Sequence, residues 1–151
     1  VDITINMVVN AINYPRLERV TNFICKGLAA KNIVFSIVAP VVKAWENKDI
    51  IPKLELVLPH LNGAFRICEK SGVNFRIPSR CGLPICMIED YKEHHDEFTS
   101  SSRFNDASDK VKVESCAKCI YNERCSGLWG NYVELYGSRE LNRSRQDDYA
   151  I

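Results

Sequence analysis

Apolar runs typical of strands divide the first half of the chain. We predict strands over residues 3–9, 33–39 and 73–77, because each run is rich in β-branched or apolar residues and is bounded by Asn, Pro or Gly. The middle run is apolar almost throughout, which is expected of a strand covered on both faces by helices. Three short strands are therefore expected before residue 80.

Helical periodicity fills the two intervals between these strands. Asn13 and Pro15 form a helix-start signal, and apolar residues at helical spacing then predict one buried stripe, formed by Leu17, Val20, Ile24 and Leu28. A second helical region spans residues 51–71, and we expect Pro59 to break it. Gly72 is placed to end it in a left-handed turn.

The order β-α-β-α-β predicts an α/β fold in which the strands are parallel and the crossovers are right-handed. Ligands of such sheets bind beyond the carboxyl ends of the strands. Three strands are few, and a buried parallel sheet with open edges exposes unpaired backbone groups. We therefore expect further strands, supplied either by a segment before Val1 or by a partner chain.

The second half of the chain has a different character. A polar run over residues 99–109 predicts a loop, and the alternation in 110–115 predicts a short strand. A helical face ending at Gly137 is predicted from Leu128, Trp129, Tyr132, Val133 and Tyr136. The expected organisation is an α/β part over 1–80, a cysteine-rich part over 81–141 and a polar tail over 142–151.

Composition excludes several classes of protein. The 151 residues are 46% hydrophobic and 26% charged, which is typical of a globular domain and not of a disordered chain. The formal net charge of +1 gives no reason to expect a nucleic-acid partner. No uncharged apolar run reaches the roughly 18 residues of a membrane span, and no secretory signal is expected, so we expect a cytoplasmic protein.

Seven cysteines are the strongest chemical signal, and five of them fall within 45 residues. Cys116-x2-Cys119-x5-Cys125 places three thiols where they can hold one zinc ion or one iron–sulfur cluster. Cys86 and Cys81 are the candidates for a fourth ligand. Buried free thiols and disulfides are the alternatives, although nothing in the sequence indicates an oxidising compartment.

The segment from Cys116 to Gly137 resembles the C-terminal auxiliary-cluster region of radical S-adenosylmethionine (SAM) enzymes. Pro84-Ile85-Cys86, the Cys-x2-Cys-x5-Cys-x-Gly motif ending at Gly127, and the pair Tyr136-Gly137 match that pattern in order. The β-α-β-α-β half is similar to the last strands of the family's partial (β/α)6 TIM barrel. The resemblance covers nearly the whole chain, and its cysteine motifs are more specific than its barrel part.

This resemblance implies that Cys86, Cys116, Cys119 and Cys125 bind one auxiliary 4Fe–4S cluster, with Cys81 as the second choice for the fourth ligand. A cysteine four residues after the third motif cysteine would imply a two-cluster SPASM domain, but that position is Trp129. The single-cluster, twitch-like form is therefore expected. The Cys-x3-Cys-x2-Cys motif that binds SAM is absent, so SAM and a second 4Fe–4S cluster belong only to a complete enzyme.

The expected function is therefore the C-terminal portion of a radical SAM oxidoreductase that modifies peptides or builds cofactors. The auxiliary cluster would transfer electrons or anchor a peptide or small-molecule substrate, with an electron donor such as flavodoxin or ferredoxin as a partner. The rival interpretations are a structural zinc module that uses the same four thiolates, and a non-catalytic interaction module. Neither a nucleic acid nor a membrane is expected as a partner.

Other residues give weaker signals. Asn10 and Ser36 are candidates for the SAM side of a barrel, and the alternatives are a turn for Asn10 and a hydroxyl bonded to backbone for Ser36. Arg76 could face a ligand or lie at an edge. Solvent exposure is expected for His94 and His95, core packing for Trp129, Tyr132 and Tyr136, and structural thiols for Cys25 and Cys68.

Overall fold

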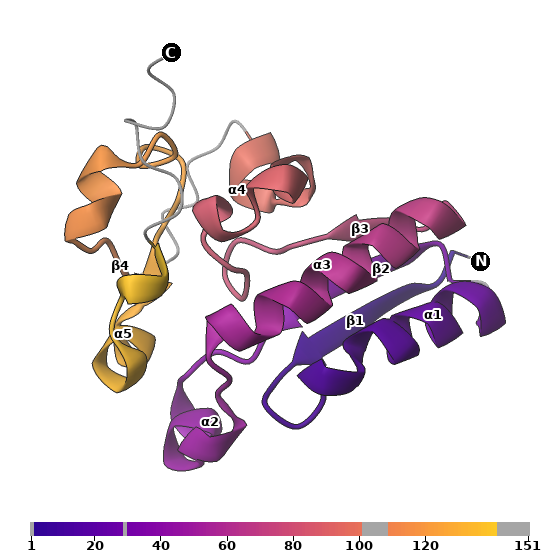
Figure 1. Ribbon diagram of the computed structural model, residues 1–151, viewed down its shortest axis with the longest axis horizontal. Helices are drawn as coiled ribbons and strands as arrows, with labels where there is room; N and C mark the ends of the chain where they lie inside the picture. The colour runs from indigo at the N-terminus through magenta and orange to yellow at the C-terminus, as the bar shows by residue number, and fades with distance from the viewer. Residues whose placement is uncertain (1, 29, 101–108, 142–151) are drawn as a thin grey trace.

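A computed structural model describes residues 2–28, 30–100 and 109–141. Its first half is a three-stranded parallel sheet in the order β1 (Thr4–Val9), β2 (Asn32–Ile37) and β3 (Asn74–Arg76) (Figure 1). Ile33 of the central strand is level with Ile5 on one side and with Phe75 on the other. The three predicted strands and their parallel pairing are confirmed.

Two helices cover one face of this sheet. The short 3-10 helix η1 (Tyr14–Arg16) leads into α1 (Leu17–Gly27), and α3 (Leu54–Ser71) follows β2 (Figure 1). The alternate positions that face them are buried: Met7, Val9, Ile33, Phe35, Ile37 and Phe75. The expectation that helices cover β2 on both faces is wrong for the described residues, because the opposite face carries mainly polar side chains such as Asn6, Asn32 and Arg76.

The buried stripe of α1 differs from the prediction. Leu17 and Ile24 are buried as expected, but Val20 and Leu28 are 40% and 43% exposed. Thr21 is fully buried instead, since the spacing 17, 21, 24 follows the helix period toward α3. Apolar character alone therefore placed the stripe one position away from its true centre.

Pro59 lies inside α3 and does not break it, so the predicted interruption is wrong. A proline removes the hydrogen bond to the carbonyl four residues earlier, which here belongs to the exposed Glu55 and remains open to water. Buried side chains on both sides of the proline hold the helix against the sheet, namely Leu54, Val57, Leu58 and Leu61. Gly72 ends the helix with φ +64°, as predicted.

The connections on either side of α3 and β3 are built from short helices. Between β2 and α3 lie α2 (Val42–Glu46) and η2 (Lys48–Ile50). After β3 come η3 (Ile85–Met87), η4 (Glu89–His94) and α4 (Asp96–Thr99). Ile77 forms a parallel bridge with His95, donating its N–H to the His94 carbonyl at 2.8 Å and accepting the Asp96 N–H at 3.0 Å. The chain itself therefore covers this end of the β3 edge.

The second half is held by a small antiparallel pair, β4 (Lys110–Val111) with β5 (Leu128–Trp129). Between these strands lies η5 (Glu114–Lys118), and after them come α5 (Gly130–Tyr136) and η6 (Arg139–Leu141). The predicted strand 110–115 is shorter than expected, and Leu128 and Trp129 belong to a strand and not to the helix. The predicted helix end at Gly137 is confirmed.

Helix α5 packs against the first half of the chain. The Tyr136 hydroxyl donates to the Ile51 carbonyl at 2.9 Å, and the Asn131 amide donates to the Pro40 carbonyl at 2.8 Å. Trp129 and Tyr132 are only 2% and 1% exposed, which confirms their predicted core packing.

Two further expectations are settled only in part. The helices that the structure describes include none that is both long and apolar enough to cross a membrane. Of the predicted loop 99–109, residues 101–108 lie outside the described residues, as does the whole predicted tail 142–151.

Candidate metal centre

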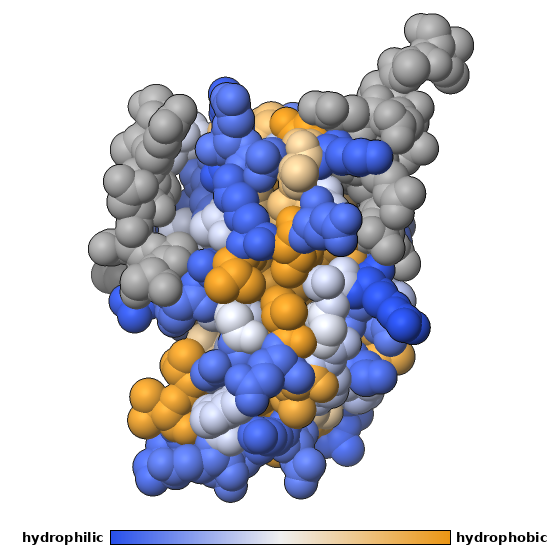
Figure 2. All heavy atoms as spheres, turned by 90° about the vertical axis from the view of Figure 1, so that its left-hand side faces the viewer, coloured by the Kyte–Doolittle hydropathy of each residue, from blue (hydrophilic) through white to orange (hydrophobic). Residues whose placement is uncertain are grey.

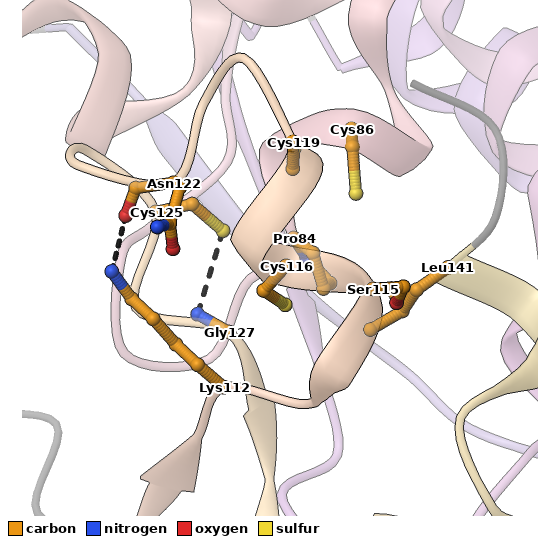
Figure 3. Close-up of a pocket in the computed structure, with 10 residues that line it drawn as sticks. All are labelled: Pro84, Cys86, Lys112, Ser115, Cys116, Cys119, Asn122, Cys125, Gly127 and Leu141. Atoms are coloured by element: carbon orange, nitrogen blue, oxygen red, sulfur yellow. Dashed lines mark hydrogen bonds between the residues drawn. The ribbon is translucent and has the colours of Figure 1, made fainter. Parts of the chain in front are cut away.

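Four cysteines from two separate stretches of the second half line one pocket. Cys116, Cys119 and Cys125 come from the motif, and Cys86 comes from η3 (Figure 3). Pro84 and Leu141 provide part of its apolar wall. The sequence therefore folds so that all four cysteines of the resemblance border the same space.

Successive tight turns place the three motif cysteines. The Cys116 N–H donates to the Val113 carbonyl at 2.9 Å, and the Cys119 N–H donates to the Cys116 carbonyl at 3.1 Å. A further turn brings the Cys125 N–H to the Tyr121 carbonyl at 2.9 Å. Consecutive turns thus fold the backbone between Cys116 and Cys125 into a compact loop, and all three cysteines line the pocket.

Cys86 lies closest to the interior of the four cysteines. Its side chain points into the space between the segments (Figure 3), and the residue is 9% exposed. Burial raises the pKa of the Cys86 thiol, and the nearby Cys125, Cys119 and Cys116 raise it further, as does a hydrogen bond with Cys119. The three motif cysteines therefore lie close enough to Cys86 to disfavour its thiolate.

Backbone N–H groups surround the Cys125 sulfur. Gly127 donates to it at 3.4 Å, and the backbone of Ile85 donates to it as well. Burial still raises the pKa of this thiol, while the two N–H donors lower it. Gly127 has φ +95°, and a Cβ at this position would lie 2.2 Å from the Val111 carbonyl oxygen. Only glycine therefore allows the loop to pass this close to β4.

The buried carboxylate of Glu97 is hydrogen-bonded to the loop that carries Cys125. Glu97 is 7% exposed, and it accepts hydrogen bonds from the Ser126 N–H at 2.9 Å and from the Ser126 hydroxyl. Lys110 lies near this carboxylate and near Cys125; it donates to the Ser79 carbonyl at 2.6 Å and sits 5.2 Å above the Trp129 ring. Burial lowers the pKa of Lys110, and Glu97 opposes that shift.

Polar groups also border the pocket. The Lys112 ammonium donates a hydrogen bond to the Asn122 carbonyl, which links the segment after β4 to the turn before Cys125. The Asn122 side-chain oxygen is buried and has no hydrogen-bond partner among the described residues. Figure 2 shows this side of the molecule, where an apolar band runs between hydrophilic margins. Val111 and Ile120, from the same half, are 41% and 42% exposed.

Cys81, the alternative fourth ligand, does not line this pocket. It follows β3, and its carbonyl accepts the Ile37 N–H at 2.6 Å beyond the end of β2. The structure therefore brings Cys86, and not Cys81, to the three motif cysteines.

The two candidates for the SAM side make local contacts. The Asn10 side-chain oxygen accepts the Ile12 N–H at 2.9 Å, so this residue shapes the turn after β1. The Ser36 hydroxyl donates to the Asn6 side chain at 2.9 Å on the face of the sheet that α1 and α3 leave uncovered. Arg76, on the same face, pairs with Asp96 at 2.6 Å.

The expectation that His94 and His95 are solvated is wrong for His95, and His94 is only half-buried. His95 is completely buried; its Nε2 lies 2.8 Å from the Leu83 carbonyl, and its Nδ1 accepts the Glu97 N–H at 3.0 Å. His94 stacks on Phe75 with ring centroids 3.8 Å apart. The charged neighbours in the sequence gave no sign of the contacts with Leu83 and Phe75, which are distant along the chain. Glu97 and Lys110 were not recognised as candidates, because nothing in their local sequence marks them.

The four cysteines border one pocket, but they do not form a closed single-ion site. Within residues 2–28, 30–100 and 109–141, no three His, Cys, Asp or Glu side chains form a group that could hold one metal ion as they stand. No protein-family model, no curated protein and no solved structure matches this chain.

Proposed function

We propose that this chain is the C-terminal portion of a radical SAM oxidoreductase and binds an auxiliary 4Fe–4S cluster through Cys86, Cys116, Cys119 and Cys125. One observation carries the proposal: these four cysteines, and not Cys81, line one pocket. Cys86 is about 30 residues from the motif along the sequence, so its position at this pocket depends on the tertiary fold.

The chemistry of the pocket suits a thiolate-bound cluster. Four thiols bordering an apolar space are the donor set that iron–sulfur clusters use. Burial and mutual repulsion disfavour the thiolate of Cys86 in the metal-free chain, and a bound cation relieves both penalties. The backbone N–H groups of Gly127 and Ile85 lie at the Cys125 sulfur. Hydrogen bonds of this kind to a ligating sulfur tune the reduction potential of a cluster.

The spread of the sulfurs favours a cluster over zinc. A structural zinc ion needs all four sulfurs about 2.3 Å from one point, whereas a cubane offers each thiolate a different iron atom. Within the described residues, the cysteines as they stand form no group that could hold one metal ion. A single ion would require the segments to close around it.

The sheet supports the barrel part of the proposal. In a TIM barrel, helices cover the outer face of the parallel strands and the inner face is turned to the barrel interior. Here α1 and α3 cover one face, and the other carries Asn6, Ser36 and Arg76. Ser36 would then face the interior near the carboxyl ends of the strands, where SAM binds in such enzymes, and Asn10 would shape the loop at that end.

The bound cluster would supply one-electron transfer or an anchoring point for substrate. The residues of this chain would hold it, shield it with Pro84 and Leu141, and set its electrostatic surroundings. The substrate is a peptide or a small molecule, and flavodoxin or ferredoxin is the expected class of electron donor. SAM cleavage belongs to the complete enzyme, because the Cys-x3-Cys-x2-Cys motif is not in this sequence.

Metal and sulfide analysis of the chain purified without oxygen tests the proposal. We expect about four iron and four sulfide per chain with broad visible absorption. Cys86→Ala should lose most of the iron, while the matched variant Cys81→Ala should retain it. One zinc per chain without colour would contradict the cluster, and equal iron loss in both variants would contradict Cys86 as the fourth ligand.

A further inference from the structure

A pocket outside the metal centre opens on the face of the sheet that α1 and α3 leave uncovered. Its volume is about 460 Å³, which lies within the range of small-molecule sites. Side chains two positions apart on a strand point to the same face, so its floor comes from alternate residues of the three strands: Thr4, Asn32, Val34, Asn74 and Arg76. We call it the sheet pocket, and the described residues that line it are all different from those of the cysteine pocket.

The sheet pocket lies toward the amino ends of the strands. Thr4, Asn32 and Asn74 are the first residues of β1, β2 and β3, and they are level with one another across the sheet. Ligands of parallel sheets ordinarily bind beyond the opposite, carboxyl ends, where Asn10 follows β1. The sheet pocket is therefore a different site from the SAM side of the proposed function.

Arg76 supplies a positive charge to the sheet pocket, and Asp96 holds it in place. The guanidinium donates to the Asp96 carboxylate at 2.6 Å. Asp96 is itself anchored, since its backbone N–H donates to the Ile77 carbonyl at 3.0 Å and its side chain is only 20% exposed. A guanidinium has five N–H donors, so the bond to one Asp96 oxygen leaves donors for a second carboxylate. Arg76 is therefore positioned to bind an anionic group of a ligand.

The wall beside β3 supplies acceptors for a cation. Glu93 and Asp96 contribute carboxylates, and His94 contributes an imidazole. The His94 Nδ1 lies 3.0 Å from the Phe75 carbonyl and must donate to it, so Nε2 is an acceptor in the neutral ring. Stacking on Phe75 fixes the orientation of this ring. With histidine counted as neutral, one guanidinium and two carboxylates line the pocket, so its net charge is negative.

We propose that the sheet pocket binds a free basic α-amino acid, for which arginine is the probe. The ligand's carboxylate binds Arg76, and its α-ammonium binds Asp96. Its side-chain cation reaches the exposed Glu93, and the amides of Asn32 and Asn74 bond its remaining polar atoms. Such a ligand carries one net positive charge, which complements the net negative charge of the pocket. Each charged group of the ligand then has a charged partner, which offsets the cost of removing it from water.

Isothermal titration calorimetry of the full chain tests the proposal with three matched ligands. Arginine is compared with citrulline, whose side chain ends in a neutral urea group, and with agmatine, which lacks the carboxylate. We expect arginine to bind with a Kd below about 1 mM, and each of the others to bind about tenfold more weakly or worse, because each loses one charge-assisted contact. No binding of arginine at about 10 mM, or equal affinities for the three ligands, would overturn the proposal.

Three variants locate the site. Arg76→Gln should remove the preference for arginine over agmatine, and Glu93→Gln should remove the preference for arginine over citrulline. Arg19→Gln is the matched control, because Arg19 is an exposed residue of α1 on the other side of the sheet, and it should bind arginine as the wild type does. Arginine should also shift the amide NMR signals of residues 32–34 and 74–76. A preference that survives in its variant, or shifts confined to other residues, would overturn the proposal.

Amino-acid binding and cluster binding can be tested separately. The Arg76 side chain is 56% exposed, so Arg76→Gln should leave the chain folded and its iron content unchanged. Cys86→Ala should conversely lose iron without altering the preference for arginine over agmatine, because Cys86 does not line the sheet pocket. Loss of that preference in Cys86→Ala while the variant remains folded would contradict binding at the sheet pocket.

Discussion

The Tyr132 hydroxyl accepts the Leu54 backbone N–H at 2.8 Å, although the two residues are 78 positions apart in the chain. Leu54 is the first residue of α3, and the side chain of the preceding Lys53 provides no cap. Glu140 completes the arrangement, since it accepts the Tyr132 hydroxyl at 2.9 Å and the Glu55 N–H at 3.0 Å. The second half of the chain therefore caps the longest helix of the first half.

Tyr132→Phe should lower the free energy of unfolding by about 1–3 kcal/mol, because it leaves the buried Leu54 N–H without its acceptor. Urea denaturation followed by circular dichroism measures this loss. Tyr136→Phe is the matched control: its hydroxyl bonds the Ile51 carbonyl, and its ring is less buried, so the loss should be smaller. Equal losses would mean that capping of α3 is not the dominant contribution of Tyr132.

Glu97→Gln should loosen the Cys125 loop. The carboxylate accepts two bonds from Ser126, and the amide of glutamine offers one acceptor oxygen in their place, so we expect a loss of about 1–3 kcal/mol in unfolding free energy. Amide hydrogen exchange should become faster at residues 125–127. The exposed Glu93→Gln is the control and should change stability by less than about 0.5 kcal/mol. Unchanged exchange in Glu97→Gln would contradict the positioning role.

Gly127→Ala should lower the free energy of unfolding much more than Gly72→Ala. Both glycines have positive φ, but a Cβ at Gly127 would meet the Val111 carbonyl, whereas a Cβ at Gly72 would meet nothing within 4 Å. We expect about 1 kcal/mol for Gly72→Ala from the backbone conformation alone. Gly127→Ala should cost about 2–4 kcal/mol from conformation and overpacking together. Thermal melts of the two variants compare these values, and similar losses would contradict the close approach of the loop to β4.

His95 should make stability depend on pH in the mildly acidic range. Burial lowers its pKa below the ordinary value of 6.5; Glu97, Asp96 and the Leu83 carbonyl oppose this shift, and Lys110 reinforces it. Since the unfolded chain then binds the proton more readily, the stabilisation is fully present above about pH 6.5 and is lost as the pH falls toward the lowered pKa.

The measurement is the free energy of unfolding of wild type and His95→Gln between pH 7.5 and pH 5. The wild-type value should fall more steeply with acidification than that of the variant. Parallel curves would contradict a neutral, buried His95.

Local sequence predicted the strands and the order of elements because each strand is a short apolar run between residues that break secondary structure. Pro59 does not break α3, because the cost of a proline depends on whether the freed carbonyl meets water and on how much side-chain burial holds the helix on either side. Thr21 was missed for a similar reason, because its burial follows from the direction of α1 against α3. These are tertiary effects that no window of the sequence contains.

The candidate metal centre was predictable in its composition but not in its surroundings. The spacing of Cys116, Cys119 and Cys125 is a local signal, whereas the choice between Cys86 and Cys81 depends on how η3 folds back toward the motif. Glu97 and His95 lie in a strongly charged stretch that reads as exposed. Their burial depends on Ser126 and Leu83, which lie elsewhere in the chain.

The two margins of the parallel sheet are not equivalent. Beside β3, the N–H and C=O groups of Ile77 are already bonded by the segment His94–Asp96. Beside β1, no strand within the described part of the chain pairs on the side away from β2. An added strand can therefore extend the ladder through β1, and it would find the opposite margin obstructed at Ile77. The two edges of the sheet are therefore unequal, and a strand added to this sheet would pair with β1.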